Sequence, residues 1–162
     1  MEKPSFLTKL KNEKKLESVE PSGEICNSYI EKANNCLKSA KLLLQSNLFE
    51  NSVSMSYFSM YNSLTALLFK VGIKCENHAG SILVFKKLFR RKDLFKIISF
   101  AKEERIDKQY YVTSEKNFVL TKESAEDMVV KAEDFLVKMK LIISEINNEE
   151  IENIRSEFKR ID

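Results

Sequence analysis

The chain has 162 residues, of which 31% are charged, and a formal net charge of +3. At this length one domain is the default, and the chain can bury a core without metals or disulfides. Three glycines and two prolines leave little material for tight turns, so the composition argues against strands and hairpins and favours an all-α fold. The small net charge argues neither for nor against a nucleic-acid partner.

No cofactor or metal is expected from the residue types present. His78 is the only histidine, and the sequence has no glycine-rich phosphate loop and no acidic cluster with metal spacing. Cys26, Cys36 and Cys75 are odd in number and share no CxxC spacing, which favours reduced, mostly buried thiols in a cytoplasmic protein. The first twenty residues carry charges throughout, unlike a signal peptide.

The first half of the chain predicts an N-terminal arm and two helices. Residues 1–20 form an arm or a short helix, and Ser22 then caps an amphipathic helix that continues to about Gln45. The stretch 51–69 has no charged residue, yet it is too rich in Ser, Asn, Thr and Tyr for a membrane span. Because its apolar residues lie on more than one face, we expect a central helix that is buried on several sides and ends at Gly72.

The second half predicts a series of capped helices. Residues that can cap or open a helix precede three apolar stretches: Asn77, Asp93 and Thr121. The segment 112–120 is expected to be a loop, and residues 148–162 a charged tail helix. We therefore predict an antiparallel, up-and-down bundle of four to five main helices over residues 21–147.

Three stretches of the chain, in this order, resemble the HEPN superfamily, and in particular a stand-alone prokaryotic branch of it. They are KLESVEPSGE, then SMSYFSMYNSLTALLFKVGIKCENHAG, then ERIDKQYY followed by TKESAEDMVVKAEDFL. The resemblance implies an antiparallel helical bundle that pairs into a homodimer. It also implies association with a nucleotidyltransferase-type partner protein, or with nucleotides or RNA, in a toxin–antitoxin or defence pair.

Arg105 decides between a binding module and an enzyme. Many HEPN domains are metal-independent ribonucleases in which an Arg is followed four to six residues later by a His. Here Tyr110 and Tyr111 stand where that His would fall, and a tyrosine with an ordinary pKa of about 10 is a poor general base. The favoured interpretation is a non-catalytic binding module. The alternative is a ribonuclease with a divergent site made of Arg105, Tyr110 and His78.

The residues expected to bind a ligand or partner are Arg105, Gln109, Tyr110, Tyr111 and His78. Arg105 and Gln109 share a helix face at the i,i+4 spacing, and a planar guanidinium can bind phosphate or carboxylate with two nitrogens. The structural alternatives are a salt bridge between Arg105 and a neighbouring glutamate, and a hydrogen-bonding role for His78 at a helix start.

The seam of the homodimer is predicted on the central helix, because its apolar circumference exceeds what one small bundle can cover. The predicted seam residues are Tyr57, Tyr61, Asn62 and Leu64. A small polar cleft is the alternative for the polar members, since a buried amide such as that of Asn62 needs hydrogen-bond partners.

Five basic residues stand close together in the sequence: Lys86, Lys87, Arg90, Arg91 and Lys92. Lys87, Arg90 and Arg91 could contact phosphates. A solvated basic turn between helices is the commoner meaning of such a run. Acidic residues elsewhere nearly balance these charges, so any nucleic-acid affinity should be weak and sensitive to salt.

Overall fold

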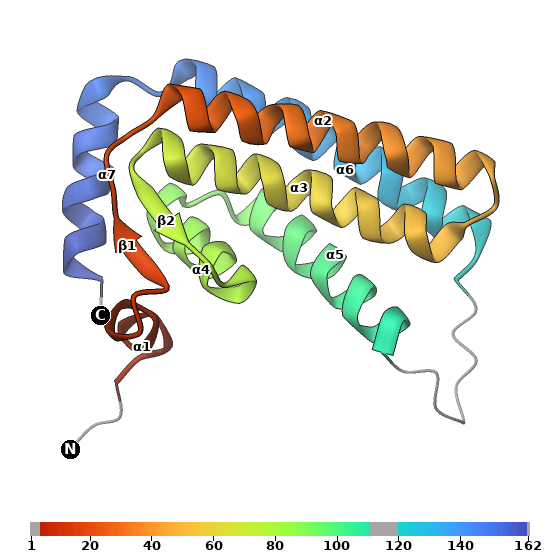
Figure 1. Cartoon of the computed structure of the whole chain (residues 1–162), viewed down its shortest axis with the longest axis horizontal. Helices are drawn as coiled ribbons and strands as arrows, with labels where there is room; N and C mark the ends of the chain where they lie inside the picture. Colours follow the sequence, from red (N-terminus) through yellow and green to blue (C-terminus); the bar gives the residue numbers. More distant parts are fainter. Residues whose placement is uncertain (1–3, 111–119, 162) are drawn as a thin grey trace.

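The chain forms a helical bundle with a short two-stranded sheet at one end (Figure 1). The computed structural model describes residues 4–110 and 120–161, with the backbone alone for residues 106–110. The helices of this part are α1 (Phe6–Asn12), α2 (Gly23–Gln45), α3 (Phe49–Lys70), α4 (His78–Phe89), α5 (Lys92–Tyr110), α6 (Lys122–Glu145) and α7 (Asn148–Arg160). The strands are β1 (Leu16–Ser18) and β2 (Ile73–Cys75). The predicted all-α class is confirmed.

Helix α3 is the centre of the bundle and packs against α2, α5 and α6. Its serines allow close approach to α2: Ser52 Oγ donates to the carbonyl of Ala40 at 2.8 Å, and Ser59 Oγ donates to that of Ala33 at 2.9 Å. Ser52 and Ser59 therefore join α3 to α2, whereas Ser63 and Thr65 donate to carbonyls of their own helix. No helix within residues 4–110 and 120–161 combines the length and apolarity needed to cross a membrane.

The predicted dimer seam needs a correction, because the chain's own helices cover the central helix. Tyr57 and Leu64 have no exposed surface within one chain, so neither can contact a second copy while the bundle is folded. Tyr61 and Asn62 are half-buried, and Asn62 Nδ2 donates to the carbonyl of Phe58 at 2.8 Å. The homodimer stays a prediction, and its seam cannot be formed by Tyr57 or Leu64.

The helix starts follow the capping residues predicted from the sequence. The side chains of Ser22, Asn77 and Thr121 each accept a hydrogen bond from the backbone three residues later, at the starts of α2, α4 and α6. Asp93 lies in the first turn of α5. These contacts satisfy backbone amides that have no partner within the helix, and they fix where each helix begins.

The short sheet departs from the expectation that the chain has no strands. Gly72, with φ of +77°, turns the chain from α3 into β2, and β2 then pairs antiparallel with β1. A low glycine content argues against several hairpins. The single turn at Gly72 is nevertheless sufficient to bring a strand of three residues into place. The sheet leads into the start of α4, because Asn77 and His78 come shortly after β2.

The tail helix α7 is tied to the N-terminal segment, and Figure 1 shows α7 beside β1 with its last turn near α1. Arg155 Nη1 donates to the carbonyl oxygen of Val19 at 2.7 Å and to that of Gly72 at 3.3 Å. Lys11 Nζ donates to the carbonyl of Phe158 at 3.1 Å. The predicted arm and tail therefore contact each other and hold the turn that leads into β2.

The cysteines are free thiols, as predicted, but only Cys26 is fully buried; Cys36 and Cys75 are partly exposed. Burial raises the pKa of the Cys26 and Cys36 thiols. Because the thiolate is the reactive form, these two residues are poor nucleophiles at neutral pH.

Candidate functional site

Arg105 and His78 lie in one aromatic cluster, where α5 and the start of α4 pack on α3. The guanidinium carbon of Arg105 is 4.5 Å from the ring centre of Phe58 and 5.4 Å from that of Tyr57. The His78 imidazole stacks on Tyr61, with the ring centres 3.7 Å apart and the planes at 12°. We call these five residues the Arg105–His78 cluster. The structure thus brings together two of the residues predicted to bind a ligand.

Three helices position the cluster, each for a local reason. Tyr57 and Tyr61 are four residues apart on α3, so their rings lie on one face and stack 6.1 Å apart. His78 is the first residue of α4, and its place is fixed by Asn77, whose Oδ1 accepts a hydrogen bond from Gly80 N at 2.8 Å. Arg105 comes from α5 and lies over the aromatic rings of α3.

Tyr57 sets the orientation and the tautomer of His78. The Tyr57 hydroxyl is 2.7 Å from His78 Nδ1, its only hydrogen-bond partner among the described residues, and the tyrosine has no exposed surface. If Nδ1 carried the proton, the buried phenolic hydrogen would have no acceptor, which costs ~1–3 kcal/mol. We therefore assign Tyr57 as the donor, Nδ1 as the acceptor, and the imidazole proton to Nε2.

The surroundings keep His78 neutral and Tyr57 protonated. Burial, and then the positive charges of Arg105 and Lys102, lower the pKa of His78. Burial is also the main cause that raises the pKa of Tyr57 and Tyr61. At neutral pH the imidazole therefore offers an N–H donor at Nε2, and neither phenol is ionised.

Arg105 has hydrogen-bonding capacity to spare. Its side chain is half-buried, and its buried Nε has no partner among the described residues. A guanidinium has five N–H donors and no acceptor, and it binds phosphate or carboxylate with charge-assisted hydrogen bonds. Together with Nε2–H of His78, it gives the cluster a set of donors suited to an anion.

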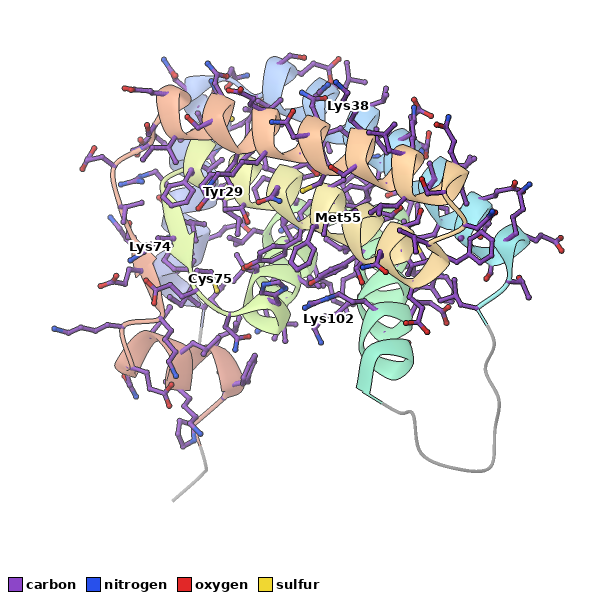
Figure 2. All side chains as sticks on the ribbon, turned by 45° about the vertical axis from the view of Figure 1, so that its right-hand side comes forward. Tyr29, Lys38, Met55, Lys74, Cys75 and Lys102 are labelled. Atoms are coloured by element: carbon purple, nitrogen blue, oxygen red, sulfur yellow. The ribbon has the colours of Figure 1, made fainter. Side chains whose placement is uncertain are left out.

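Lys102 is a second positive charge at this site, and sequence reasoning missed it. Its charge contributes to the lowered pKa of His78, and Figure 2 shows it between α4 and α5. Lys102 lies three residues before Arg105 on α5, so the i,i+3 spacing was an available signal. What the sequence could not show is that this side of α5 meets the start of α4.

Three predicted ligand-binding residues cannot be placed. The side chains of Gln109 and Tyr110, and all of Tyr111, lie outside the described residues. Their contact with a ligand or partner stays a prediction.

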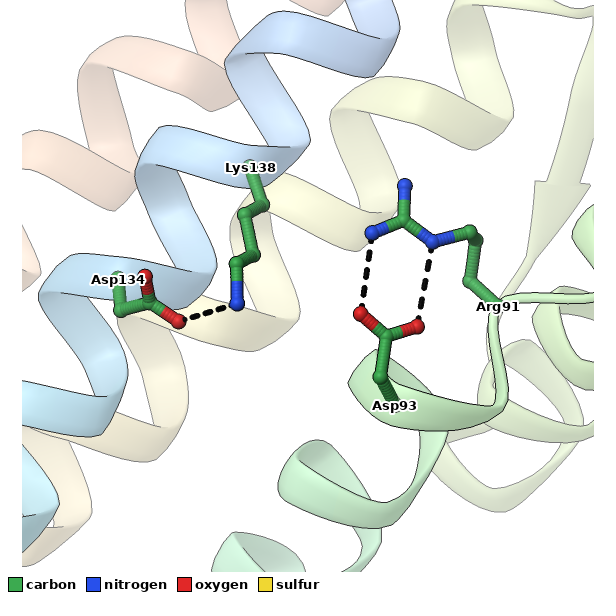
Figure 3. Close-up of polar contacts among 4 residues, drawn as sticks. All are labelled: Arg91, Asp93, Asp134 and Lys138. Atoms are coloured by element: carbon green, nitrogen blue, oxygen red, sulfur yellow. Dashed lines mark hydrogen bonds and ion pairs between the residues drawn. The ribbon is translucent and has the colours of Figure 1, made fainter.

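Two arginines of the basic run, Arg90 and Arg91 between α4 and α5, form ion pairs. Arg91 binds Asp93 with two nitrogens, Nε at 3.2 Å and Nη2 at 3.0 Å from the carboxylate oxygens (Figure 3). Arg90 Nη2 lies 3.6 Å from Glu157 Oε1, and Lys87 is exposed. Two of the three predicted phosphate contacts therefore already have a carboxylate partner, which favours a solvated basic turn.

The cluster offers nitrogen donors and aromatic faces to a ligand. Among the described residues, no three His, Cys, Asp or Glu side chains lie together in a way that could hold a metal ion. The arrangement is suited to binding anionic and planar groups.

The fold and the cluster define an all-helical domain with a cationic, aromatic site where three helices meet. The model of the HEPN domain matches residues 26–143, and the chain belongs to the HEPN domain family. The family that the sequence resembles is therefore confirmed.

Three relatives cover most of the chain. The protein named "Putative toxin MJ0142" from Methanocaldococcus jannaschii is 33% identical over 134 residues, which are 78% of this chain and 88% of that protein. A "UPF0332 protein" from Thermotoga maritima is 28% identical over 120 residues, 71% of this chain and 88% of that protein. "Putative toxin MJ0605" from M. jannaschii is 28% identical over 120 residues, 72% of this chain and 87% of that protein.

Proposed function

We propose that this chain is a HEPN-type binding protein whose Arg105–His78 cluster holds a phosphate group of a nucleotide or of RNA. The proposal rests on the hydrogen bond from Tyr57 to His78 Nδ1, which leaves the imidazole with a donor at Nε2. A phosphate accepts hydrogen bonds and carries negative charge, as these donors require. Amides at the start of α4 act in the same direction, because a helix N-terminus attracts anions.

The proposal extends to the biological setting. Two relatives carry the word toxin in their names, which supports a role in a toxin–antitoxin or defence pair with a nucleotidyltransferase-type protein as partner. A homodimer in the cytoplasm belongs to the same proposal. Light scattering at micromolar concentration measures the oligomer, and a monomer alone would refute the dimer.

Ribonuclease activity is the second candidate, because an imidazole and a guanidinium occupy one cluster although no His follows Arg105 in the sequence. Cleavage requires a base that takes the proton of a 2′-hydroxyl. With its proton on Nε2 and Nδ1 bound to Tyr57, His78 has no free nitrogen for this task. Binding without cleavage is therefore the better-supported function.

The test compares Arg105→Ala with a matched control, Arg160→Ala, which removes an exposed arginine of α7. Binding of AMP and of a short single-stranded RNA is measured at low, fixed salt, since phosphate contacts depend on salt. Arg105→Ala should weaken binding by about 10- to 100-fold, the range of a hydrogen bond to a charged group. Arg160→Ala should match the wild type. Equal affinities for both variants would refute the proposal.

The same RNA is incubated with the wild-type protein and a chelator at neutral pH. We expect it to stay intact. Cleavage that disappears in both Arg105→Ala and His78→Gln would make the chain a ribonuclease instead.

A further inference from the structure

A second pocket lies between α4 and α5, beside the Arg105–His78 cluster. Its volume is about 170 Å³, and it is lined by Ala79 and Leu83 of α4 and by Phe95, Ser99, Lys102 and Glu103 of α5. Ala79 directly follows His78 in the chain, and Lys102 acts electrostatically on the His78 imidazole. The pocket and the cluster are therefore neighbouring parts of one surface.

The pocket lining is partly apolar and partly polar. Its apolar side chains, here called the wall, are those of Ala79, Ile82, Leu83 and Phe95, and its polar groups, here called the rim, are the hydroxyl of Ser99, the ammonium of Lys102 and the carboxylate of Glu103. Its volume is below the ~300 Å³ at which pockets for drug-sized ligands begin. It has room for one planar ring system, while the rest of a ligand would lie outside it.

We propose that this pocket binds the base of the nucleotide whose phosphate lies at the Arg105–His78 cluster. The inference rests on the proposed function and adds the class of ligand, a nucleotide with an unpaired base. Unpaired bases are bound by aromatic stacking and by hydrogen bonds to their edges. Phe95 supplies the aromatic group, and Ser99 and Glu103 face the edge.

The rim favours a base with an exocyclic amino group. The Glu103 carboxylate accepts such a hydrogen bond, as acidic side chains do from cytosine N4, and the Ser99 hydroxyl can donate or accept. Lys102 lines the pocket and acts on His78, so its positive charge belongs to both the pocket and the cluster. Uracil, which has no amino group, should bind less well than cytosine.

Lys86 indicates where a longer ligand would continue. Its ammonium lies 4.7 Å from the centre of the Phe95 ring, and the Phe95 side chain lines the pocket. Lys86 is eight residues after His78 on α4, a separation of about 12 Å at the helical rise of ~1.5 Å per residue. A strand of RNA with one phosphate at His78 and its base in the pocket would bring a later phosphate toward Lys86.

The experiment measures the affinity of CMP, UMP and ribose 5-phosphate, which has the sugar and phosphate but no base. CMP should bind the wild-type protein about 5- to 100-fold more tightly than ribose 5-phosphate, the range that base stacking supplies. Ser99→Leu, which fills the pocket, should abolish this difference and leave ribose 5-phosphate binding unchanged. Glu103→Gln keeps the shape of the rim and should reduce the preference for CMP over UMP.

The outcomes separate this inference from the proposed function. Equal binding of CMP and ribose 5-phosphate by the wild type, or a preference that survives in Ser99→Leu, would overturn the base pocket and leave the phosphate site standing. Ribose 5-phosphate binding that is unaffected by Arg105→Ala would overturn both. If Ser99→Leu does not fold, Leu83→Ala serves instead, since opening the wall should weaken CMP binding and spare ribose 5-phosphate.

A short single-stranded RNA identifies the source of the nucleotide. Tighter binding of a cytidine hexamer than of CMP, lost in Lys86→Ala, would show that the nucleotide belongs to RNA. Equal binding of the two, unaffected by Lys86→Ala, would show a free nucleotide. Either result supports the base pocket, and a hexamer that binds equally to Ser99→Leu and the wild type contradicts it.

Discussion

Tyr57→Phe removes one oxygen atom and tests the assignment on which the proposed function depends. The ring keeps its volume, so no large cavity forms, while the 2.7 Å hydrogen bond to His78 Nδ1 is lost. A hydrogen bond of this kind contributes about 0.5–1.5 kcal/mol. For a domain of this size, that loss lowers the melting temperature by roughly 1–6 °C.

The larger effect is on the imidazole. The hydrogen bond from Tyr57 stabilises neutral His78, so its removal should raise the pKa of His78 from its lowered value. It should also allow the imidazole proton to move from Nε2 to Nδ1, because Tyr57 no longer donates a hydrogen bond to Nδ1. Nuclear magnetic resonance of the ring nitrogens reports both quantities, and the signals are unambiguous because His78 is the only histidine.

Two results would refute this reasoning. One is a wild-type spectrum with the proton on Nδ1, since Nε2 would then be free to act as a base. The other is an unchanged or lower pKa of His78 in Tyr57→Phe, since the hydrogen bond would then have no influence on the imidazole. A matched control is Tyr29→Phe, because Tyr29 stacks on Phe69 rather than on His78, and this substitution should leave the His78 spectrum unchanged.

Three further predictions concern stability. The pKa of His78 is lowered on folding, so the contribution of His78 to stability should be complete above about pH 6.5 and lost as the pH falls. The urea midpoints at pH 7.5 and pH 5 should therefore differ less for His78→Gln than for the wild type. Gly72→Ala places an alanine at an unfavourable φ of +77° and makes its Cβ collide with neighbouring atoms, so it should lower the free energy of unfolding by more than ~1 kcal/mol. The control Gly23→Ala has open space around the new Cβ and should not destabilise the protein. Leu64→Ala should cost ~2–5 kcal/mol because the side chain is fully buried, whereas Leu42→Ala, 54% exposed, should have little effect on the urea midpoint.

The fold could be predicted where the signals are local. Ser22, Asn77 and Thr121 cap helices by contacts within their own first turn, so the sequence alone locates those starts. The pairing of Leu16 with Cys75 joins segments far apart in the chain, and no local pattern announces it. The sheet was therefore missed, although the turn at Gly72 was predicted.

The apolar faces of α3 show a second limit of predicting structure from the sequence alone. Periodicity indicates that Tyr57 and Leu64 are buried, but it does not indicate what buries them. A second copy of the chain and the chain's own helices satisfy the same pattern, and in the structure α2, α5 and α6 do so. Arg105 and His78 were each predicted as ligand-binding residues, whereas their meeting across α3 depends on tertiary packing.

Under the proposed function, binding and cleavage at this site would differ by the position of one proton. A cation for the phosphate and a nearby imidazole are both present, and the buried hydroxyl of Tyr57 holds the imidazole as a donor. Tyr57→Phe should let Nε2 accept a proton part of the time, so we expect weak cleavage of single-stranded RNA that is absent from the wild type and from Tyr57→Phe/His78→Gln. If Tyr57→Phe binds RNA and leaves it intact while its imidazole proton is shown to have moved, the geometry of Arg105 and His78 does not suit in-line attack. The site would then be a binding site for reasons beyond the tautomer.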